Sequence, residues 1–370
     1  YEEALSLDCD FFFIVSLITE IYTKEPKRFF EHAVDAHRYY LEIDPYRVES
    51  LQALRKIYTS AKRPDESWCM CQALRCLKQA DVDEEKFFKK YRLTRLAKTK
   101  QPITDDLWRE LLLHPAQDAT LTAIFATLTP AIVATQSQQL STFGVGENNR
   151  IDPINDQTAM GRMLAHVAET MTTHLPPVYD VPHDAGGLSF LFSNPPAIGV
   201  GQGAKAGGPQ QALAFVAGRH LSYFRHGHYV RQIVPTGTGL RAWLLSAIRS
   251  VAPKFPIPQT MEQQVRECVA ALGQTLSGPQ RDALRSLTQK LLEAAPELDM
   301  KAWMAGVDLT ADRIGFVLSN DLKIANAVIE ASPEDASSVG RKDRMNELLA
   351  YSTSEPYFEL RKRIGIALGG

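Results

Sequence analysis

The chain has 370 residues, of which 45% are hydrophobic and 23% are charged, and its formal net charge at pH 7 is −2. This length allows two or three domains, each with its own core, and the composition excludes a chain that is mostly disordered. Because 41 basic residues nearly cancel 43 acidic ones, we expect no global electrostatic attraction to nucleic acid or to an anionic membrane.

The cysteines and the apolar stretches indicate a cytoplasmic protein without membrane insertion. Five cysteines are an odd number, and three of them lie close together, which is a poor framework for disulfides in a secreted protein. The apolar stretch "FFFIVSLI" is too short to cross a bilayer, and the given sequence shows no basic start followed by an apolar core and a small-residue cleavage site. Since the sequence opens at "YEEALSLDCD" without Met, we expect it to be a piece of a longer protein.

Residues 29–80 are predicted to form two helical hairpins. The stretch "FFEHAVDAHRYYLEIDP" has apolar residues at spacings of three and four, and "RVESLQALRKIYTSAKRPDESW" does the same before Pro64. A shift of 37 residues lays Ala36, Tyr40 and Asp44 on Ala73, Leu77 and Asp81. The predicted buried faces are Phe30, Ala33, Ala36, His37, Tyr40 and Leu41 in the first helix and Leu51, Leu54, Ile57 and Tyr58 in the second.

Over residues 28–95 this pattern resembles the tetratricopeptide repeat, in which helix pairs carry small residues at their contacts and a Pro near the turn. The usual Trp and Gly are absent. The resemblance implies stacked helical hairpins with a concave binding surface, because a single repeat cannot bury its own apolar face. An ordinary helical bundle is the alternative.

Two features of the same region have simpler interpretations than binding sites. In "CMCQALRC", Cys69 and Cys76 share a helix face while Cys71 points away, and no fourth ligand completes a tetrahedron, so we expect core packing. The basic run "KFFKKYRLTRLAKTKQP" is predicted to be a solvated helix face. The alternative is that residues Lys86 to Arg95 bind an acidic or nucleic-acid partner, although the composition does not favour nucleic acid.

A second unit is predicted to begin near residue 103, where "TDD" offers a helix N-cap. Amphipathic helical stretches are followed after Pro176 by short strand-like runs, "PVYDVP", "LSFLF" and "PAIGVGQG". From "GGPQQALAFVAGRHLSYF" onward the helical period returns, with breaks around 252–258, 277–279 and 331–340. The expected fold class is α+β: helical hairpins over 1–102, then a mainly helical domain over 103–370 with a small β-sheet at about 177–201.

Residues 155–320 resemble the gluzincin (HExxH-type) zinc peptidases in the order of their segments. A helix leads into strands, "PPAIGVGQG" is similar to the family's edge strand, "QALAFVAGRHLSYFRHGH" to its active-site helix, and "DLTADRIGFVL" to its later ligand helix. The resemblance implies a zincin-like domain. Such zinc sites need two neutral imidazoles one helical turn apart, a Glu that activates water and a third ligand from a later helix.

Carried over by position, the resemblance puts the wrong residues in the ligand places. The first zinc His corresponds to Arg219, the catalytic Glu to His220, the second His to Tyr223, the later Glu to Asp308 and the family's Asp to Asp312. Sliding the first alignment by one residue gives Gly218, Arg219 and Ser222 instead, and neither register binds zinc. Arg219 stays protonated and offers only donors, so it repels a cation. We hypothesise that it pairs with Asp308 where the metal would have been.

Other chemical interpretations of the second unit remain open at this stage. A metal-dependent hydrolase could use a site rebuilt from His220, His226 and His228, although residues six and eight apart do not share a helix face. The pair His183 and Asp184 is predicted to lie in a turn, and "VPTGTGLRAW" to be a helix N-terminus without a complete phosphate-loop pattern.

The favoured function is therefore non-catalytic binding, with no metal and no cofactor. We expect a pseudoenzyme that binds a protein or peptide partner in a multi-protein complex, as a scaffold, and the resemblance is to domains at the ends of long bacterial repeat proteins. An extended peptide would add as a strand to the sheet. The expected binding residues are Ala197, Ile198, Gly199, Val200, Arg219 and Tyr223.

Overall fold

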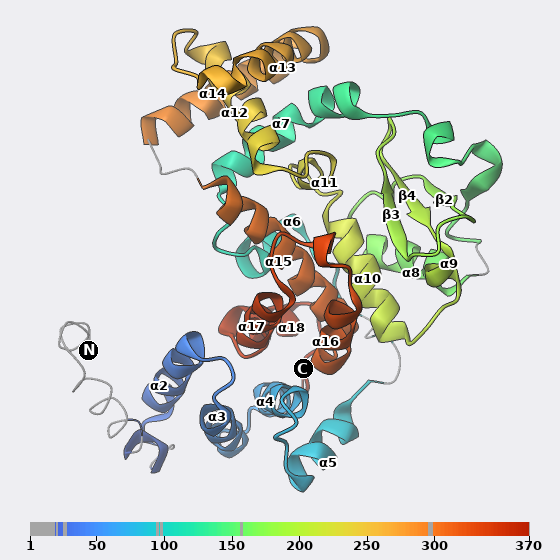
Figure 1. Cartoon of the computed structure of the whole chain (residues 1–370). Coiled ribbons are helices and arrows are strands. Elements are labelled where there is room, and N and C mark those ends of the chain that lie inside the picture. Colours follow the sequence, from blue (N-terminus) through green and yellow to red (C-terminus); the bar gives the residue numbers. More distant parts are fainter. Residues whose placement is uncertain are drawn as a thin grey trace. The chain divides into compact units, whose positions relative to one another are not determined.

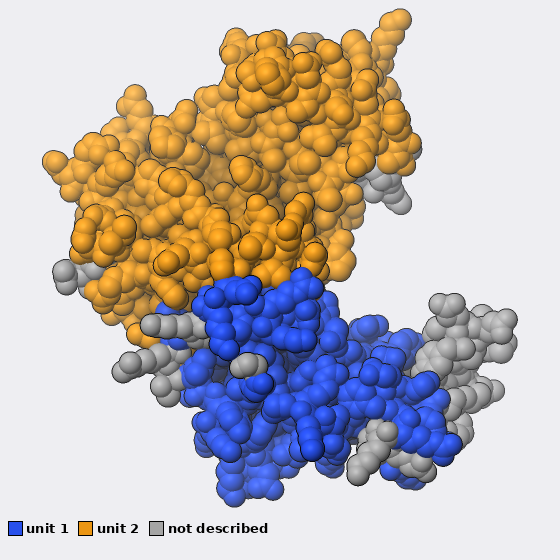
Figure 2. Space-filling model, turned by 180° about the vertical axis from the view of Figure 1, so that it is seen from behind, with its two compact units in different colours: residues 1–101, 319–332, 341–370 blue, residues 102–318, 333–340 orange. Residues whose placement is uncertain are grey.

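The computed structural model describes residues 19, 21–24, 28–93, 96, 99–155, 158–294 and 299–369. Helices dominate, and four short strands form one mixed sheet, which agrees with the predicted α+β class (Figure 1). The chain divides into two compact units, coloured separately in Figure 2. Unit 1 comprises residues 1–101, 319–332 and 341–370, and unit 2 comprises residues 102–318 and 333–340.

Unit 1 consists of helices in two groups along the chain. Its helices are α2 (Phe30–Ile43), α3 (Val48–Ser60), α4 (Pro64–Cys76), α5 (Val82–Tyr91), α16 (Leu322–Ala331), α17 (Arg341–Ser352) and α18 (Glu355–Arg363). The predicted apolar faces of α2 and α3 are buried, with Phe30 only partly so. Cys69 and Cys71 are fully buried in α4, which confirms their predicted core packing.

The first four helices of unit 1 repeat along the sequence with a fixed offset. Helix α2 begins at Phe30 and α4 at Pro64, while α3 begins at Val48 and α5 at Val82, which is the same offset of 34 residues. This is shorter than the 37 residues that the sequence match indicated. The capping box of α5 fixes its start, because the Asp81 carboxylate accepts from the Glu84 N–H and the Glu84 side chain accepts from the Asp81 N–H.

The division of the chain differs from the predicted domains at the C-terminal side. The boundary near 102 coincides with the change between units, but α16, α17 and α18 belong to unit 1 rather than to the second domain. Long-range polar contacts explain this. Arg361 of α18 binds both carboxylate oxygens of Asp65 in α4, at 2.9 and 2.8 Å, and the Leu322 N–H donates to Gln72 of α4. Sequence patterns carry no signal for such distant pairs.

Unit 2 holds the sheet and the remaining helices. The sheet strands are β1 (Arg150–Ile151), β2 (Val178–Asp180), β3 (Leu188–Leu191) and β4 (Ala197–Val200). The helices are α6 (Asp105–Leu107), the π-helix Trp108–Leu112, α7 (Ala119–Gln136), α8 (Ala159–Thr170), α9 (Gln202–Lys205), α10 (Gln210–Ser222), α11 (Val230–Ile233), α12 (Gly237–Val251), α13 (Glu262–Thr275), α14 (Gly278–Ala294) and α15 (Met300–Ser319). Short 3-10 turns lie at Leu140–Phe143, Glu147–Asn149, Gln259–Met261 and Glu334–Ala336.

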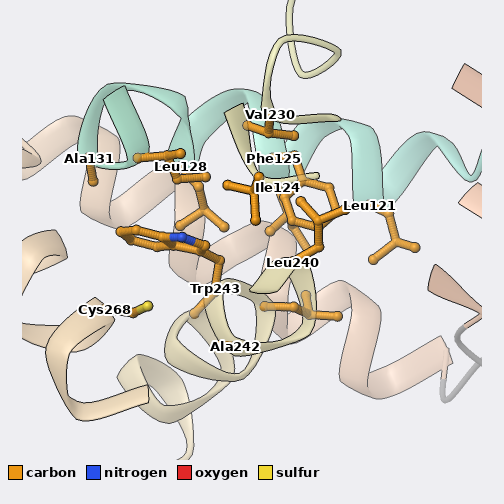
Figure 3. Close-up of a cluster of buried hydrophobic side chains, with 14 of the residues drawn as sticks. Leu121, Ile124, Phe125, Leu128, Ala131, Val230, Leu240, Ala242, Trp243 and Cys268 are labelled. Atoms are coloured by element: carbon orange, nitrogen blue, oxygen red, sulfur yellow. The ribbon is translucent and has the colours of Figure 1, made fainter. Parts of the chain in front are cut away.

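The largest apolar core of unit 2 lies between α7 and helices α11 to α15. Leu121, Ile124, Phe125 and Leu128 of α7 pack with Trp243 of α12 in this core (Figure 3). By length and composition α7 is a candidate membrane span, but one such helix is weak evidence, since a core helix passes the same test.

The sheet order is β1-β2-β4-β3, so β4 is an inner strand. It pairs in parallel with β2 and antiparallel with β3, and all four of its residues are buried. The predicted edge strand at Ala197, Ile198, Gly199 and Val200 is therefore wrong in position. Gly199 shows why this strand is central: a Cβ there would lie 2.4 Å from the Ser189 hydroxyl and 2.9 Å from Val181.

Candidate functional site

The region that resembles a peptidase site is built on two helices that come unusually close. A Cβ on Gly218 of α10 would lie 3.5 Å from the Gly315 Cα of α15 and 2.5 Å from Leu318. A Cβ on Gly315 would lie 2.9 Å from the Phe215 carbonyl oxygen. Glycines at this crossing allow the two backbones to approach. Side chains near each glycine, Arg219 after Gly218 and Asp312 before Gly315, then reach the opposite helix.

Arg219 forms an ion pair across this crossing with Asp312. Its Nε donates to Asp312 Oδ1 at 2.7 Å, and its Nη2 donates to the Ala336 carbonyl oxygen at 2.8 Å. The Asp312 side chain is fully buried. The hypothesis that Arg219 pairs with Asp308 is therefore wrong about the partner, because the carboxylate one helical turn later is the one that the guanidinium reaches.

Asp308 is the centre of a second and denser set of hydrogen bonds. Its Oδ1 accepts from the Tyr223 hydroxyl at 2.8 Å, and its Oδ2 accepts from Arg231 Nη2 at 2.9 Å. The same Oδ2 accepts from the Ser338 N–H at 2.6 Å, the Ser338 hydroxyl at 2.8 Å and the Ser337 hydroxyl at 3.2 Å. Both carboxylate oxygens of this fully buried aspartate are thus occupied by donors.

The electrostatics of the site match this arrangement. Burial opposes ionisation of Asp308, but Arg231, Arg219 and the Ser338 donors outweigh it, so the pKa of Asp308 is lowered. Burial raises the pKa of Tyr223 well above its usual value, so Tyr223 stays a neutral donor. Two arginines pair with two buried carboxylates, so the formal charges balance within the site.

His220, at the position of the catalytic Glu, faces the sheet instead of the carboxylates. Its ring stacks on Phe190 of β3, with centroids 4.0 Å apart and an interplanar angle of 19°. Burial and the neighbouring Arg219 lower the pKa of His220 to about 3, so the ring is neutral at physiological pH. Its Nε2 is buried without a hydrogen-bond partner in the part of the chain that the structure describes.

The three histidines of the alternative hydrolase site do not converge. His226 is exposed, whereas His228 is buried and hydrogen-bonds with the Gln117 side chain. A left-handed Gly227 separates them, with a φ of 80°. Across residues 19–369, leaving aside those not described, no three His, Cys, Asp or Glu side chains are grouped to hold a metal ion. The structure thus does not bring His220, His226 and His228 together as a set of metal ligands.

The edge strands of the sheet are β1, with two residues, and β3, with four, and the longer edge is that of β3. The register pairs Ser189 with Gly199, and the Gly201 N–H donates to the Gly187 carbonyl, so the main-chain groups of odd-numbered residues point toward β4. Those of Leu188 and Phe190 therefore point outward, and among the described residues they have no main-chain partner there. Two residues after Phe190, the Gln138 N–H already donates to the Phe192 carbonyl.

The remaining candidates are local structure. Asp184 accepts from the Gly186 N–H in a turn beside His183, and Thr236 caps the start of α12 by accepting from the Gly239 N–H. Sequence reasoning missed Arg231, Ser337 and Ser338. They lie outside the matched motifs, in a short helix after a loop and in a segment that was predicted only as a break, so no periodic signal could have identified them.

Comparison with known proteins identifies no relative of this chain. No protein-family model matches the chain, and no curated protein or solved structure is significantly similar to it.

Proposed function

We propose that this chain is a non-catalytic binding protein, in which a peptidase-like site serves as a structural link and the sheet edge beside it receives an extended peptide. The observation that carries the first part is that both oxygens of Asp308 are taken by Tyr223, Arg231 and Ser338, while Asp312 is paired with Arg219. A metal would have to displace two guanidinium groups from buried carboxylates. The interactions at this site therefore stabilise the folded chain instead of binding a cation.

The open edge of β3 supports the binding part of the proposal. Outward-pointing N–H and C=O groups on Leu188 and Phe190 offer hydrogen bonds to an added strand. Leu188, Phe190 and Phe192 are only partly buried, so side chains of that strand would meet apolar surface. Arg219 and Tyr223, expected as binding residues, act here by holding the helices beneath the edge. A partner protein is the proposed source of the peptide.

Unit 1 supports a scaffold role by its helix pairs. The common offset of 34 residues between successive pairs equals the usual length of a tetratricopeptide repeat. Stacked pairs of this kind present extended surfaces to other proteins. We propose that unit 1 contributes a second partner surface within a larger assembly.

Metal analysis tests the non-catalytic part. We expect the purified chain, after dialysis against zinc and then against buffer, to keep far less than one equivalent by elemental analysis. The matched comparison is a variant with the family's ligands restored, Arg219→His, His220→Glu, Tyr223→His and Asp308→Glu, with folding checked by circular dichroism. Stoichiometric zinc in the unaltered chain would refute a structural role for this site.

A proline substitution tests the peptide-binding part. Peptides selected from a display library of unstructured dodecamers should bind Leu188→Pro at least tenfold more weakly, because Pro removes the outward N–H and is tolerated on sheet edges. The control is Leu188→Ala, which shortens the same side chain but keeps the N–H. If both variants bind the selected peptides as tightly as the original chain, strand addition at β3 is excluded.

A further inference from the structure

A second surface of unit 2 has the features of a binding groove. It is a cavity of about 870 Å³ between α12 and the first turns of α15, away from the β3 edge in sequence and lined by other residues. Leu244 and Ile248 form part of its floor, and both are almost fully buried, as is Met304 from α15. Phe255, from the loop after α12, closes the apolar part of the lining.

The rim of this groove is cationic. Arg241 of α12 and Lys301 of α15 both line the cavity, and both are exposed. Neither forms an ion pair within the described ranges of the chain. The rim also carries one acidic residue, Asp299, whose Oδ1 accepts from the backbone N–H groups of Lys301 and Ala302 at 2.8 and 3.0 Å, so Arg241 and Lys301 outnumber it. Two unpaired positive charges therefore flank an apolar floor.

The walls decide which conformation a ligand can take. Along α12, Arg241, Leu244 and Ile248 lie at spacings of three and four, so they form one stripe over two turns. The main-chain N–H and C=O groups inside α12 and α15 are hydrogen-bonded within their own helices. These walls therefore have no free main-chain groups with which an extended strand could pair. A ligand that satisfies its own backbone, namely a helix, fits such walls better.

We infer that this groove binds an acidic amphipathic helix of a partner protein, whose apolar face covers Leu244, Ile248 and Met304 and whose carboxylates face Arg241 and Lys301. This surface is separate from the proposed β3 site, and the inference does not depend on it. Ser338, which also lines the cavity, is fixed by its hydrogen bonds to Asp308. The end of the groove is thus shaped by the same network that fills the peptidase-like site.

The test is selection from a display library of helical peptides with a randomised apolar face and flanking positions that carry either Glu or Lys. We expect Glu to be enriched at the flanks. The selected peptides should lose affinity about tenfold on Arg241→Glu or Lys301→Glu in fluorescence anisotropy, and exchanging a peptide Glu for Lys should restore part of the loss with Arg241→Glu. Raising the salt concentration should weaken the binding.

The matched control is Leu188→Pro, which alters the β3 edge and should leave binding of these helices unchanged. The inference would be overturned if no helical peptide were selected or if Lys were enriched at the flanking positions. It would also be overturned if neither charge reversal changed the affinity of the selected peptides. Binding of dodecanoate to the original chain, lost on Arg241→Glu, without binding of any helix, would overturn it in favour of a small amphiphile. Loss of peptide binding at β3 alone would contradict only the proposed function.

Discussion

Units 1 and 2 each bury arginine and aspartate side chains, yet they use them differently. In unit 1, Arg361 binds both oxygens of Asp65, and the Leu368 N–H donates to the same carboxylate at 2.8 Å. In unit 2, the charges are spread over two aspartates and two arginines, and Tyr223 joins the network. The first is centred on one bidentate pair between residues 296 positions apart, whose guanidinium also donates to Asn320, Tyr357 and the Ile366 carbonyl. The second is a branched network of two such pairs at a helix crossing.

The difference shows that buried charge does not by itself mark a functional site. The Asp65 pair joins α4 to α18 and so holds together the N-terminal and C-terminal parts of unit 1. The Asp308 network ties the segment 333–340 to α15 in the place where the resemblance expects a metal. In both arrangements, each of these aspartates is paired with an arginine.

The largest expected effect is on the pair of Asp65 and Arg361. Asp65→Ala leaves the Arg361 guanidinium buried without its main partner, which should cost unit 1 about 3–5 kcal/mol of unfolding free energy. Hydrogen exchange measured by mass spectrometry would locate the loss in α4 and α18. The double variant Asp65→Leu with Arg361→Met removes both charges and should be much less destabilised. If it is as unstable as Asp65→Ala, the effect is not due to an unpaired charge.

Removing one charge conservatively from the branched network should destabilise unit 2 less than Asp65→Ala destabilises unit 1. Asp308→Asn keeps the size and one acceptor oxygen, so we expect a loss of about 1.5–3 kcal/mol of unfolding free energy, the range for hydrogen bonds to a charged group. Proteolysis within 333–340 should become faster, because Ser337 and Ser338 lose their anionic acceptor. Asp335→Asn, at an exposed position of the same segment, is the control. Equal proteolysis of both variants would contradict the proposed anchoring.

The helix crossing beneath this network is tested by adding one methyl group. Gly315→Ala should destabilise unit 2 by about 1–3 kcal/mol, since its Cβ would lie 2.9 Å from the Phe215 carbonyl and the backbone must shift. Gly273→Ala in α13 adds the same group where no atom lies within 4 Å. That control should be neutral or slightly stabilising, because Ala favours helix. Thermal denaturation of both variants gives the comparison.

The last expected effect is gradual, a slope of the unfolding free energy with pH. Burial lowers the pKa of His220 to about 3 and those of His37 and His228 to about 4, while the unfolded chain titrates near 6.5. As pH falls from 6.5 toward 4.5, only the unfolded state takes up these protons, so the unfolding free energy decreases by about 1.4 kcal/mol per pH unit for each histidine. Above 6.5 these groups contribute no slope.

Unit 2 holds two of these histidines and unit 1 holds one, so the slope should be steeper in unit 2. The ionised Asp308 carboxylate also stabilises the folded state. That stabilisation is lost only at lower pH, because the pKa of Asp308 is below its ordinary value in the folded state. Denaturant titrations at several pH values, followed by hydrogen exchange in each unit, measure this. His220→Leu should reduce the slope of the unfolding free energy of unit 2 against pH by the contribution of one proton. An unchanged slope would show that His220 does not titrate on unfolding.

Local patterns predicted much of the secondary structure. The apolar spacing located α2 and α3, the Gly and Pro punctuation located β2, β3 and β4, and the breaks near 252–258, 277–279 and 331–340 agree with the helix ends. The motif match identified Arg219, Tyr223, Asp308 and Asp312 as residues of one site. It could not identify the pairing, because the partner of Arg219 depends on which turn of α15 its guanidinium reaches.

The sequence by itself determined where helices and strands form, since side-chain periodicity, caps and turn residues act over a few neighbouring positions. It also determined that Arg219 cannot ligate a metal, because a guanidinium has no lone pair to offer. The tertiary structure alone decided that β4 is an inner strand and β3 the open edge. It also decided that α16 to α18 return to unit 1 and that Arg231 and Ser338 occupy Asp308. Those outcomes depend on contacts between residues tens to hundreds of positions apart, which no local pattern encodes.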